Sequence, residues 1–110
     1  MRAAVLDTIP GELVVGDVEV RDPQPREVLI RTVAAGLCHS DLHFMEGKYV
    51  CELPVVLGHE SAGIVEAVGS HVTYVQPGDP VVTCVSGFCG TCSYCLAGRP
   101  NLCTRVALQP

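Results

Sequence analysis

The feature that most constrains the fold of this chain is a run of four cysteines in its last quarter. The run has the spacing C-x2-C-x2-C-x7-C and consists of Cys89, Cys92, Cys95 and Cys103. Gaps of two residues let neighbouring sulfurs converge on one ion, and four thiolates form a tetrahedral ligand set that suits zinc. Gly90 relieves crowding between the first two ligands, and Gly98 lets the chain turn back to deliver the fourth. Since protein fills every coordination position, the spacing predicts a structural zinc whose binding energy holds the loop together.

Two other uses of clustered cysteines remain open at this stage. Disulfides fit poorly, because the total of seven cysteines is odd and the N-terminal sequence does not resemble a signal peptide. An iron–sulfur cluster is the sharper alternative, since bacterial ferredoxins use the spacing C-x2-C-x2-C-x3-C-P. Here the last gap is seven residues, and Thr104 rather than proline follows the final cysteine. The spacing therefore favours zinc.

Composition limits the classes of partner that we expect. Hydrophobic residues make up 48% of the chain and charged residues 17%, which suits one packed domain. A net charge of −5 argues against binding to nucleic acid or to an anionic membrane. The sequence also lacks an apolar run of about 20 residues, the length that a membrane-spanning helix needs. We therefore expect a cytoplasmic protein with no nucleic-acid or membrane partner.

Short apolar segments between proline and glycine predict a mainly β fold. Residues rich in valine and leucine indicate strands at 2–6, 13–20, 27–36, 54–58, 61–68 and 81–85. The strand at 27–36 is apolar on both faces, so we expect it to be central in its sheet. One or two helical turns are expected at 40–45, with Ser40 or Asp41 as the cap and Gly47 at the end. The pattern predicts one domain over 1–110, a β-barrel or sandwich with few short helices and a zinc-stabilised loop at 86–104.

A second group of metal-ligating residue types lies at the ends of two predicted strands. Cys38 follows the strand at 27–36, and His59 with Glu60 precedes the strand at 61–68. A thiolate and an imidazole at two strand ends could share an ion. A single cysteine or histidine more often fills a core or faces solvent, so this pattern alone is weak evidence for a metal site.

Two longer motifs resemble those of the zinc-dependent medium-chain alcohol dehydrogenases. The sequence GLCHSD at 36–41 resembles the first zinc-ligand motif of that family, and GHESAGIV at 58–65 resembles the second. Gly69 and Gly78-Asp79 continue the family pattern, and the four cysteines have the spacing of its structural zinc. The resemblance runs through nearly the whole chain in the family's order. It implies a GroES-like catalytic domain with a partly open β-barrel. The Rossmann domain for the nicotinamide cofactor would lie later in the sequence and is absent from these residues.

The resemblance also implies a catalytic zinc. In the family, the residues matching Cys38 and His59 bind this ion, and a third ligand, another cysteine, would follow residue 110. Glu60 matches a carboxylate close to the metal that can itself become a ligand. Asp41 matches a carboxylate that hydrogen-bonds the metal-bound histidine. The family thus implies two zinc ions, one catalytic and one structural.

Three further residues match positions that move protons or contact the cofactor. Ser40 matches the hydroxyl that takes the proton from the alcohol, and His43 matches the imidazole that passes it to solvent. His39 falls where the family often contacts the cofactor pyrophosphate. Cys51, Cys84 and His71 match no ligand position, and we expect them to have no role in the site.

The function implied by the resemblance is oxidation of an alcohol to an aldehyde or ketone with NAD or NADP, by a homo-oligomeric enzyme. We expect the chain to be an N-terminal portion of such an enzyme and to be inactive alone. One alternative is a non-catalytic, zinc-binding GroES-like structural or interaction module. Another is a different dehydrogenase of the superfamily, acting on a polyol, threonine or a thiol adduct of formaldehyde. The residues that a purely structural module would not require are Cys38, Ser40, His43, His59 and Glu60.

Overall fold

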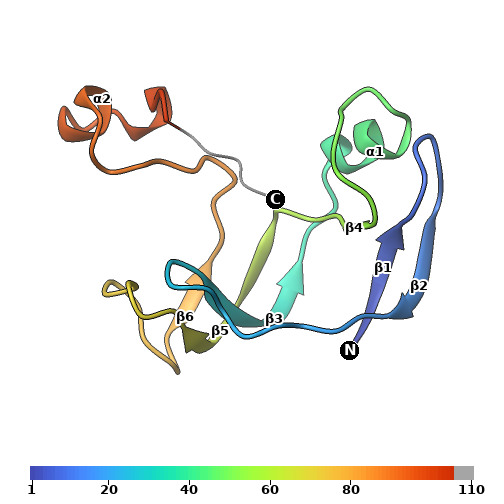
Figure 1. Cartoon of the computed structure of the whole chain (residues 1–110), viewed down its shortest axis with the longest axis horizontal. Coiled ribbons are helices and arrows are strands. Elements are labelled where there is room, and N and C mark those ends of the chain that lie inside the picture. Colours follow the sequence, from blue (N-terminus) through green and yellow to red (C-terminus); the bar gives the residue numbers. More distant parts are fainter. Residues whose placement is uncertain (106–110) are drawn as a thin grey trace.

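The computed structural model describes residues 1–105 and has a mainly β fold, as predicted (Figure 1). The last five residues of the predicted domain, 106–110, lie outside the described part. The first sheet has the strand order β2-β1-β4 and is antiparallel throughout. Its strands are β1 (Arg2–Leu6), β2 (Leu13–Asp17) and β4 (Val55–Val56).

The second sheet holds the segment that precedes the candidate metal ligands. Its antiparallel strands are β3 (Val28–Ala35), β5 (Ser61–Val68) and β6 (Pro80–Val82), in the order β3-β5-β6. The prediction that residues 27–36 form a central strand is wrong for the described residues, because β5 is central and β3 lies at an edge. Apolar residues on both faces of β3 indicated burial but not a pairing partner, and Val33 is 68% exposed.

Most predicted strands are present, and several are shorter than expected. The strand at 2–6 and the strand at 61–68 have the predicted bounds. β2 ends at Asp17 rather than at residue 20, because its partner β1 begins at Arg2, directly after the N-terminus. β6 ends at Val82, where regular pairing with β5 stops at Ala62.

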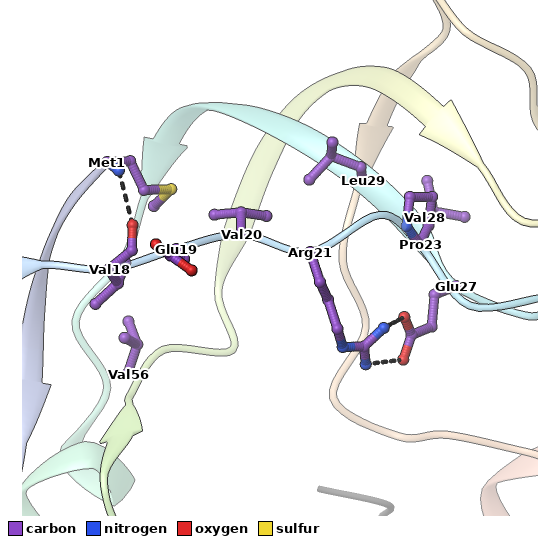
Figure 2. Close-up of a pocket in the computed structure, with 10 residues that line it drawn as sticks. All are labelled: Met1, Val18, Glu19, Val20, Arg21, Pro23, Glu27, Val28, Leu29 and Val56. Atoms are coloured by element: carbon purple, nitrogen blue, oxygen red, sulfur yellow. Dashed lines mark hydrogen bonds and ion pairs between the residues drawn. The ribbon is translucent and has the colours of Figure 1, made fainter.

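The predicted partly open barrel is realised as two open sheets that do not close within residues 1–105 (Figure 1). The connector from β2 to β3 lines a hollow of about 570 Å³ (Figure 2). On this connector Arg21 makes two hydrogen bonds to the carboxylate of Glu27, at 2.6 and 2.8 Å. These bonds lower the pKa of Glu27 to about 2. The ion pair joins two exposed residues of an irregular segment between the sheets.

The apolar core of the described chain is small. Its buried hydrophobic side chains are those of Leu6, Val65 and Cys92. The chain exposes 8252 Å², whereas a folded monomer of this length exposes about 5,800 Å². Within residues 1–105, no helix has the length and hydrophobicity needed to cross a lipid bilayer. Because so few apolar side chains are buried, hydrophobic packing contributes little to the stability of residues 1–105.

Candidate metal centres

The first centre begins at helix α1 (His39–Met45), directly after β3. The predicted caps, Ser40 and Asp41, lie inside the helix, and Cys38 is the N-cap. The Cys38 N–H donates to Asp41 Oδ2 at 3.0 Å, so the third helical residue closes the cap from within. Asp41 is consequently buried, at 9% exposure, although it is charged. As predicted, Gly47 lies just beyond the end of the helix, with a φ of +80°.

Antiparallel pairing brings the two predicted ligand segments together. Ala35 at the end of β3 pairs with Ser61 at the start of β5, so Cys38 and His59 leave the sheet at the same edge. The Gly36 N–H donates to the Glu60 carbonyl at 2.8 Å and extends this pairing by one step. As a result, the sulfur of Cys38, a ring nitrogen of His59 and a carboxylate oxygen of Glu60 lie within 4.8 Å of one another.

The imidazole of His59 is oriented by two groups of α1. Its Nδ1 lies 3.4 Å from Asp41 Oδ1, and its Nε2 lies 3.3 Å from the Ser40 hydroxyl. A metal-binding histidine usually donates its second ring N–H to a carboxylate, which fixes the tautomer and the ring orientation. The contact with Asp41 therefore leaves Nε2 as the nitrogen that faces the Cys38–Glu60 side of the group.

The electrostatics of this centre favour a deprotonated sulfur. Hydrogen bonds from the hydroxyl and backbone of Ser40, and then from His59, lower the pKa of Cys38, while the charge of Glu60 opposes them. The Cys38 interaction in turn raises the pKa of His59 against the effect of burial, with a further contribution from Asp41. Sulfur and imidazole thus stabilise each other as a charged pair. A divalent cation can replace the imidazolium proton as the partner of the thiolate.

The other predicted residues of α1, His39 and His43, contact each other and Tyr49. The rings of His39 and His43 meet edge to face at 4.8 Å, and those of His43 and Tyr49 at 5.3 Å. His43 Nδ1 is buried without a hydrogen-bond partner, and Glu46 Oε2 lies 3.7 Å from it. Within residues 1–105, no hydrogen bond joins His43 to Ser40 or His59. The structure therefore brings Cys38, Ser40, Asp41, His59 and Glu60 together and leaves these two histidines beside that group.

One residue of this centre was not predicted from the sequence. Thr83, just after β6, forms hydrogen bonds with the backbone of His59 and with Ser61. The only signal for it would have been the pairing register of β5 and β6, which places Thr83 opposite Ser61 once Ala62 pairs with Val82.

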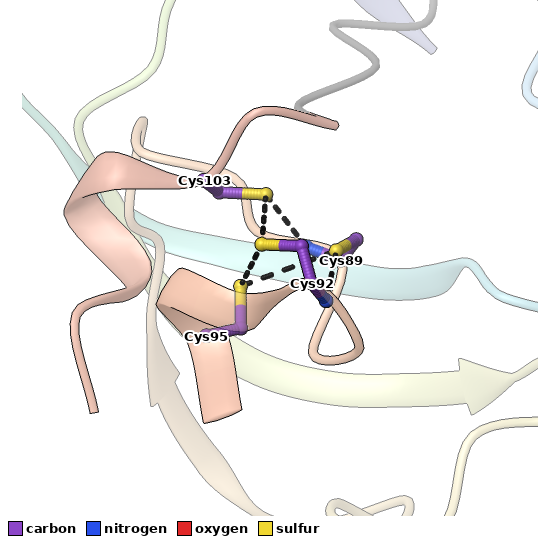
Figure 3. Close-up of side chains that lie close together, drawn as sticks. All are labelled: Cys89, Cys92, Cys95 and Cys103. Atoms are coloured by element: carbon purple, nitrogen blue, oxygen red, sulfur yellow. Dashed lines mark hydrogen bonds between the residues drawn. The ribbon is translucent and has the colours of Figure 1, made fainter. Parts of the chain in front are cut away.

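The second centre is formed by the four cysteines of the predicted zinc loop, which lie outside the two sheets (Figure 1). Their side chains point toward a common point (Figure 3). The sulfur of Cys95 lies 3.4 Å from that of Cys92 and 4.0 Å from that of Cys89. Cys103 lies 3.9 Å from Cys92, again between sulfurs. Four sulfurs at the usual 2.3 Å from one tetrahedral zinc ion would stand about 3.8 Å apart, so the geometry fits a single ion.

Backbone groups of the loop stabilise negative charge on part of this cluster. The N–H groups of Thr91 and Cys92 donate to the sulfur of Cys89 at 3.5 and 3.3 Å. The backbone and hydroxyl donors of Thr91 are the main causes that lower the pKa of Cys89 to about 5. Loss of hydration instead raises the pKa of Cys95 to about 11. A divalent metal would supply the positive charge that stabilises thiolates at such closely spaced sulfurs.

Two glycines allow the loop to close around the sulfurs. Gly90 and Gly98 both have a φ of +73°, which other residues rarely adopt. Gly98 ends α2 (Ser93–Leu96), where its N–H donates to the Cys95 carbonyl at 3.1 Å. The Arg99 N–H donates to the Tyr94 carbonyl at 2.9 Å, which completes a Schellman motif. The short 3-10 helix η1 (Pro100–Leu102) then returns the chain to the cluster at Cys103.

A known protein family matches most of the chain. The family described as the alcohol dehydrogenase GroES-like domain matches residues 24–108. The chain is 49% identical over 102 residues to the NDMA-dependent alcohol dehydrogenase of Amycolatopsis methanolica. That match covers 93% of this chain and 28% of the relative, so the chain spans little more than a quarter of its length.

Solved structures show the same relationship. An NAD-dependent alcohol dehydrogenase is 43% identical with a TM-score of 0.80, and the match covers 96% of this chain and 32% of that one. The cobalt- and zinc-bound thermostable alcohol dehydrogenase of Pyrobaculum aerophilum is 40% identical with a TM-score of 0.85. This match also covers 96% of the present chain and 32% of its relative.

Proposed function

The chain belongs to the alcohol dehydrogenase GroES-like domain family, and from this membership we propose that it supplies the zinc-binding part of the active site of an alcohol dehydrogenase. The proposed reaction is oxidation of a small alcohol to an aldehyde or ketone, with NAD or NADP as hydride acceptor. The observation that carries the proposal is the convergence of Cys38, His59 and Glu60, with Ser40 and Asp41 on the two nitrogens of the imidazole. A purely structural zinc domain does not require these residues.

In the proposed site, Cys38 and His59 hold a zinc ion, with Glu60 close enough to exchange as a ligand. A zinc ion bound there would supply Lewis acidity, which makes the hydroxyl proton of an alcohol easier to remove. Asp41 orients the imidazole by accepting from His59 Nδ1. The lowered pKa of Cys38 favours its thiolate, which is the form that binds a cation.

Two further side chains of α1 can take part in proton transfer. The Ser40 hydroxyl lies beside the ligand group, where its oxygen can accept a hydrogen bond from the hydroxyl of an alcohol. The partly exposed imidazole of His43 lies one helical turn further along α1 and can exchange a proton with solvent. His39, on the same helical face, would contact the cofactor phosphates.

The second centre would hold a structural zinc through Cys89, Cys92, Cys95 and Cys103. Separations of 3.4 to 4.0 Å between sulfurs suit one ion, whereas sulfurs around a cluster of several irons must stand further apart. All seven cysteines are free thiols in this structure, which speaks against a disulfide framework. Zinc would thus have a structural role in one centre and a catalytic role in the other.

The proposal is tested by counting metals in the product of the complete reading frame, purified without added zinc. Elemental analysis is expected to give two zinc ions per chain, one after Cys38→Ala exchange, and two after Cys84→Ala. Cys84 is the matched control because it is exposed and lies outside both groups. Alcohol-dependent reduction of NAD or NADP should be lost in Cys38→Ala and retained in Cys84→Ala.

Other metal counts would overturn parts of the proposal. One zinc per chain, unchanged by Cys38→Ala, would reject the catalytic centre and favour the non-catalytic zinc module. Iron in place of zinc would reject the interpretation of the four-cysteine loop.

A further inference from the structure

Thr83 joins the end of β6 to the segment that carries His59 and Glu60. Its hydroxyl oxygen lies 3.0 Å from the His59 carbonyl, 3.1 Å from the Ser61 nitrogen and 3.2 Å from the Ser61 hydroxyl. A hydroxyl has one proton to donate and two lone pairs to accept with. The proton can be donated to the His59 carbonyl, which is nearer than the alternative acceptor, the Ser61 carbonyl at 3.3 Å, while the lone pairs accept from the Ser61 N–H and hydroxyl.

This contact lies where regular strand pairing stops. The ladder between β5 and β6 ends at Ala62 and Val82, and the Thr83 N–H donates to the Ser61 carbonyl at 2.9 Å. The Thr83 side chain then contacts the carbonyl of His59, three residues beyond the last ladder residue, Ala62. No main-chain hydrogen bond from β6 to His59 is present in the described residues, so this side chain provides the attachment on that side.

The segment is attached on its opposite side by β3. There the Gly36 N–H donates to the Glu60 carbonyl at 2.8 Å. Gly36 also lies so close to the Glu60 carboxylate that a β-carbon in its place would collide with it. The backbone of His59 and Glu60 is therefore held between two strands, by a main-chain bond on one side and by the Thr83 hydroxyl on the other.

We propose that Thr83 is a positioning residue of the Cys38–His59–Glu60 centre, acting through the backbone of His59. It keeps the carbonyl of His59 fixed, and this directs the imidazole toward Cys38 and Ser40. The inference rests on the proposed function, because it takes His59 to be a metal ligand. Residues that orient metal ligands typically change metal affinity by about 10–100-fold when they are replaced.

Co²⁺ binding to the zinc-free product of the complete reading frame tests the proposal. Its d–d absorption distinguishes a site of four sulfurs from a site of mixed ligands. Thr83→Val removes the hydroxyl and nearly preserves the shape, and it should weaken Co²⁺ binding at the mixed site by about 10–100-fold. Thr83→Ser retains the hydroxyl and should restore binding to within a few-fold of the parent protein. Binding at the four-cysteine site should be unchanged in both variants.

Three results would overturn the proposal. Thr83→Val could bind Co²⁺ at the mixed site like the parent protein, Thr83→Ser could lose as much affinity as Thr83→Val, or both sites could weaken together. The last two would indicate general packing rather than the hydroxyl. His59→Ala in the same assay separates this inference from the proposed function. If His59→Ala leaves the mixed-site spectrum intact, the proposed function itself fails, whereas a loss in His59→Ala without one in Thr83→Val rejects only the role of Thr83.

Discussion

Asp41 is a buried carboxylate that serves two neighbours at once. One oxygen accepts the N–H of Cys38 and the other contacts the imidazole of His59. A buried charge is tolerated only where its hydrogen bonds are made. Asp41 therefore both closes the N-terminal cap of α1 and orients the imidazole of His59. A substitution of Asp41 would alter the helix cap and the metal centre together.

Asp41→Asn is expected to weaken metal binding at the Cys38–His59 centre by about 10–100-fold, because the amide keeps the shape and loses the charge facing Nδ1. Competition with a coloured chelator measures this affinity. The exposed Asp22→Asn is the matched control and should bind zinc like the parent protein. Equal affinities for Asp41→Asn and the parent would show that the carboxylate does not orient His59.

At the scale of elements, the pairing of β3 with β5 sets the position of both ligand segments. Gly63 on β5 approaches the Arg31 carbonyl on β3, and a β-carbon there would overlap it. Gly63→Ala must therefore separate the strands locally and should lower the free energy of unfolding by about 1–3 kcal/mol. Urea unfolding of the zinc-loaded protein measures the change.

The control for the Gly63→Ala substitution is Gly16→Ala on β2, where a β-carbon meets no atom within 4 Å. It should change the free energy of unfolding by no more than about 0.5 kcal/mol. If the two alanine variants unfold at the same urea concentration, the close approach at Gly63 does not constrain the sheet.

Zinc binding by the four-cysteine loop should depend on pH. Zinc binds thiolates, so protons compete with it and binding weakens as pH falls. The pKa of Cys89 is lowered to about 5, so even this acidic thiol becomes protonated below that pH. We expect zinc release to rise steeply as pH falls through about 5, as measured with a chromogenic chelator between pH 8 and 3. Cys84→Ser should follow the same curve, and a release curve that is flat down to pH 3 would contradict the prediction.

The sequence predicts these elements unequally. The four-cysteine loop could be recognised because ligand spacing is local, and the strand at 61–68 because apolar residues, several of them β-branched, dominate it. The edge position of β3 and the role of Thr83 depend on which strands pair, and pairing between distant segments leaves no local pattern. The N-cap at Cys38 was missed because cysteine is an unusual cap, while the Asp41 carboxylate that closes it is the third residue of the helix.

On the scale of the whole molecule, the second sheet presents an exposed apolar face. Val33 is 68% exposed and Val82 is 79% exposed, beside a hollow of about 330 Å³ on the same sheet. Exchange of both valines for threonine should reduce the fluorescence of a hydrophobic dye bound to the 110-residue chain. Val50→Thr, at a site 94% exposed and away from that sheet, should leave it unchanged. Equal dye binding by the double variant and the parent would show that this face is not the apolar surface.

The 110-residue chain expressed alone should show no alcohol-dependent reduction of NAD. Its residues supply three ligand atoms of the candidate catalytic centre, and they contain no G-x-G-x-x-G segment for a dinucleotide. A spectrophotometric assay at 340 nm checks this, with a known NAD-dependent alcohol dehydrogenase as the positive control. Measurable activity of the 110 residues would refute the expectation.

The four sulfurs gathered on a loop outside the sheets also change what a melting temperature means for this protein. A ligand that binds only the folded form adds RT ln(1 + [L]/Kd) to the free energy of unfolding, about 4 kcal/mol at a thousand times Kd. With three apolar side chains buried among residues 1–105, such a contribution is comparable to the whole stability of a small domain. Thermal resistance is then a function of the zinc activity in the surrounding buffer as well as of the polypeptide.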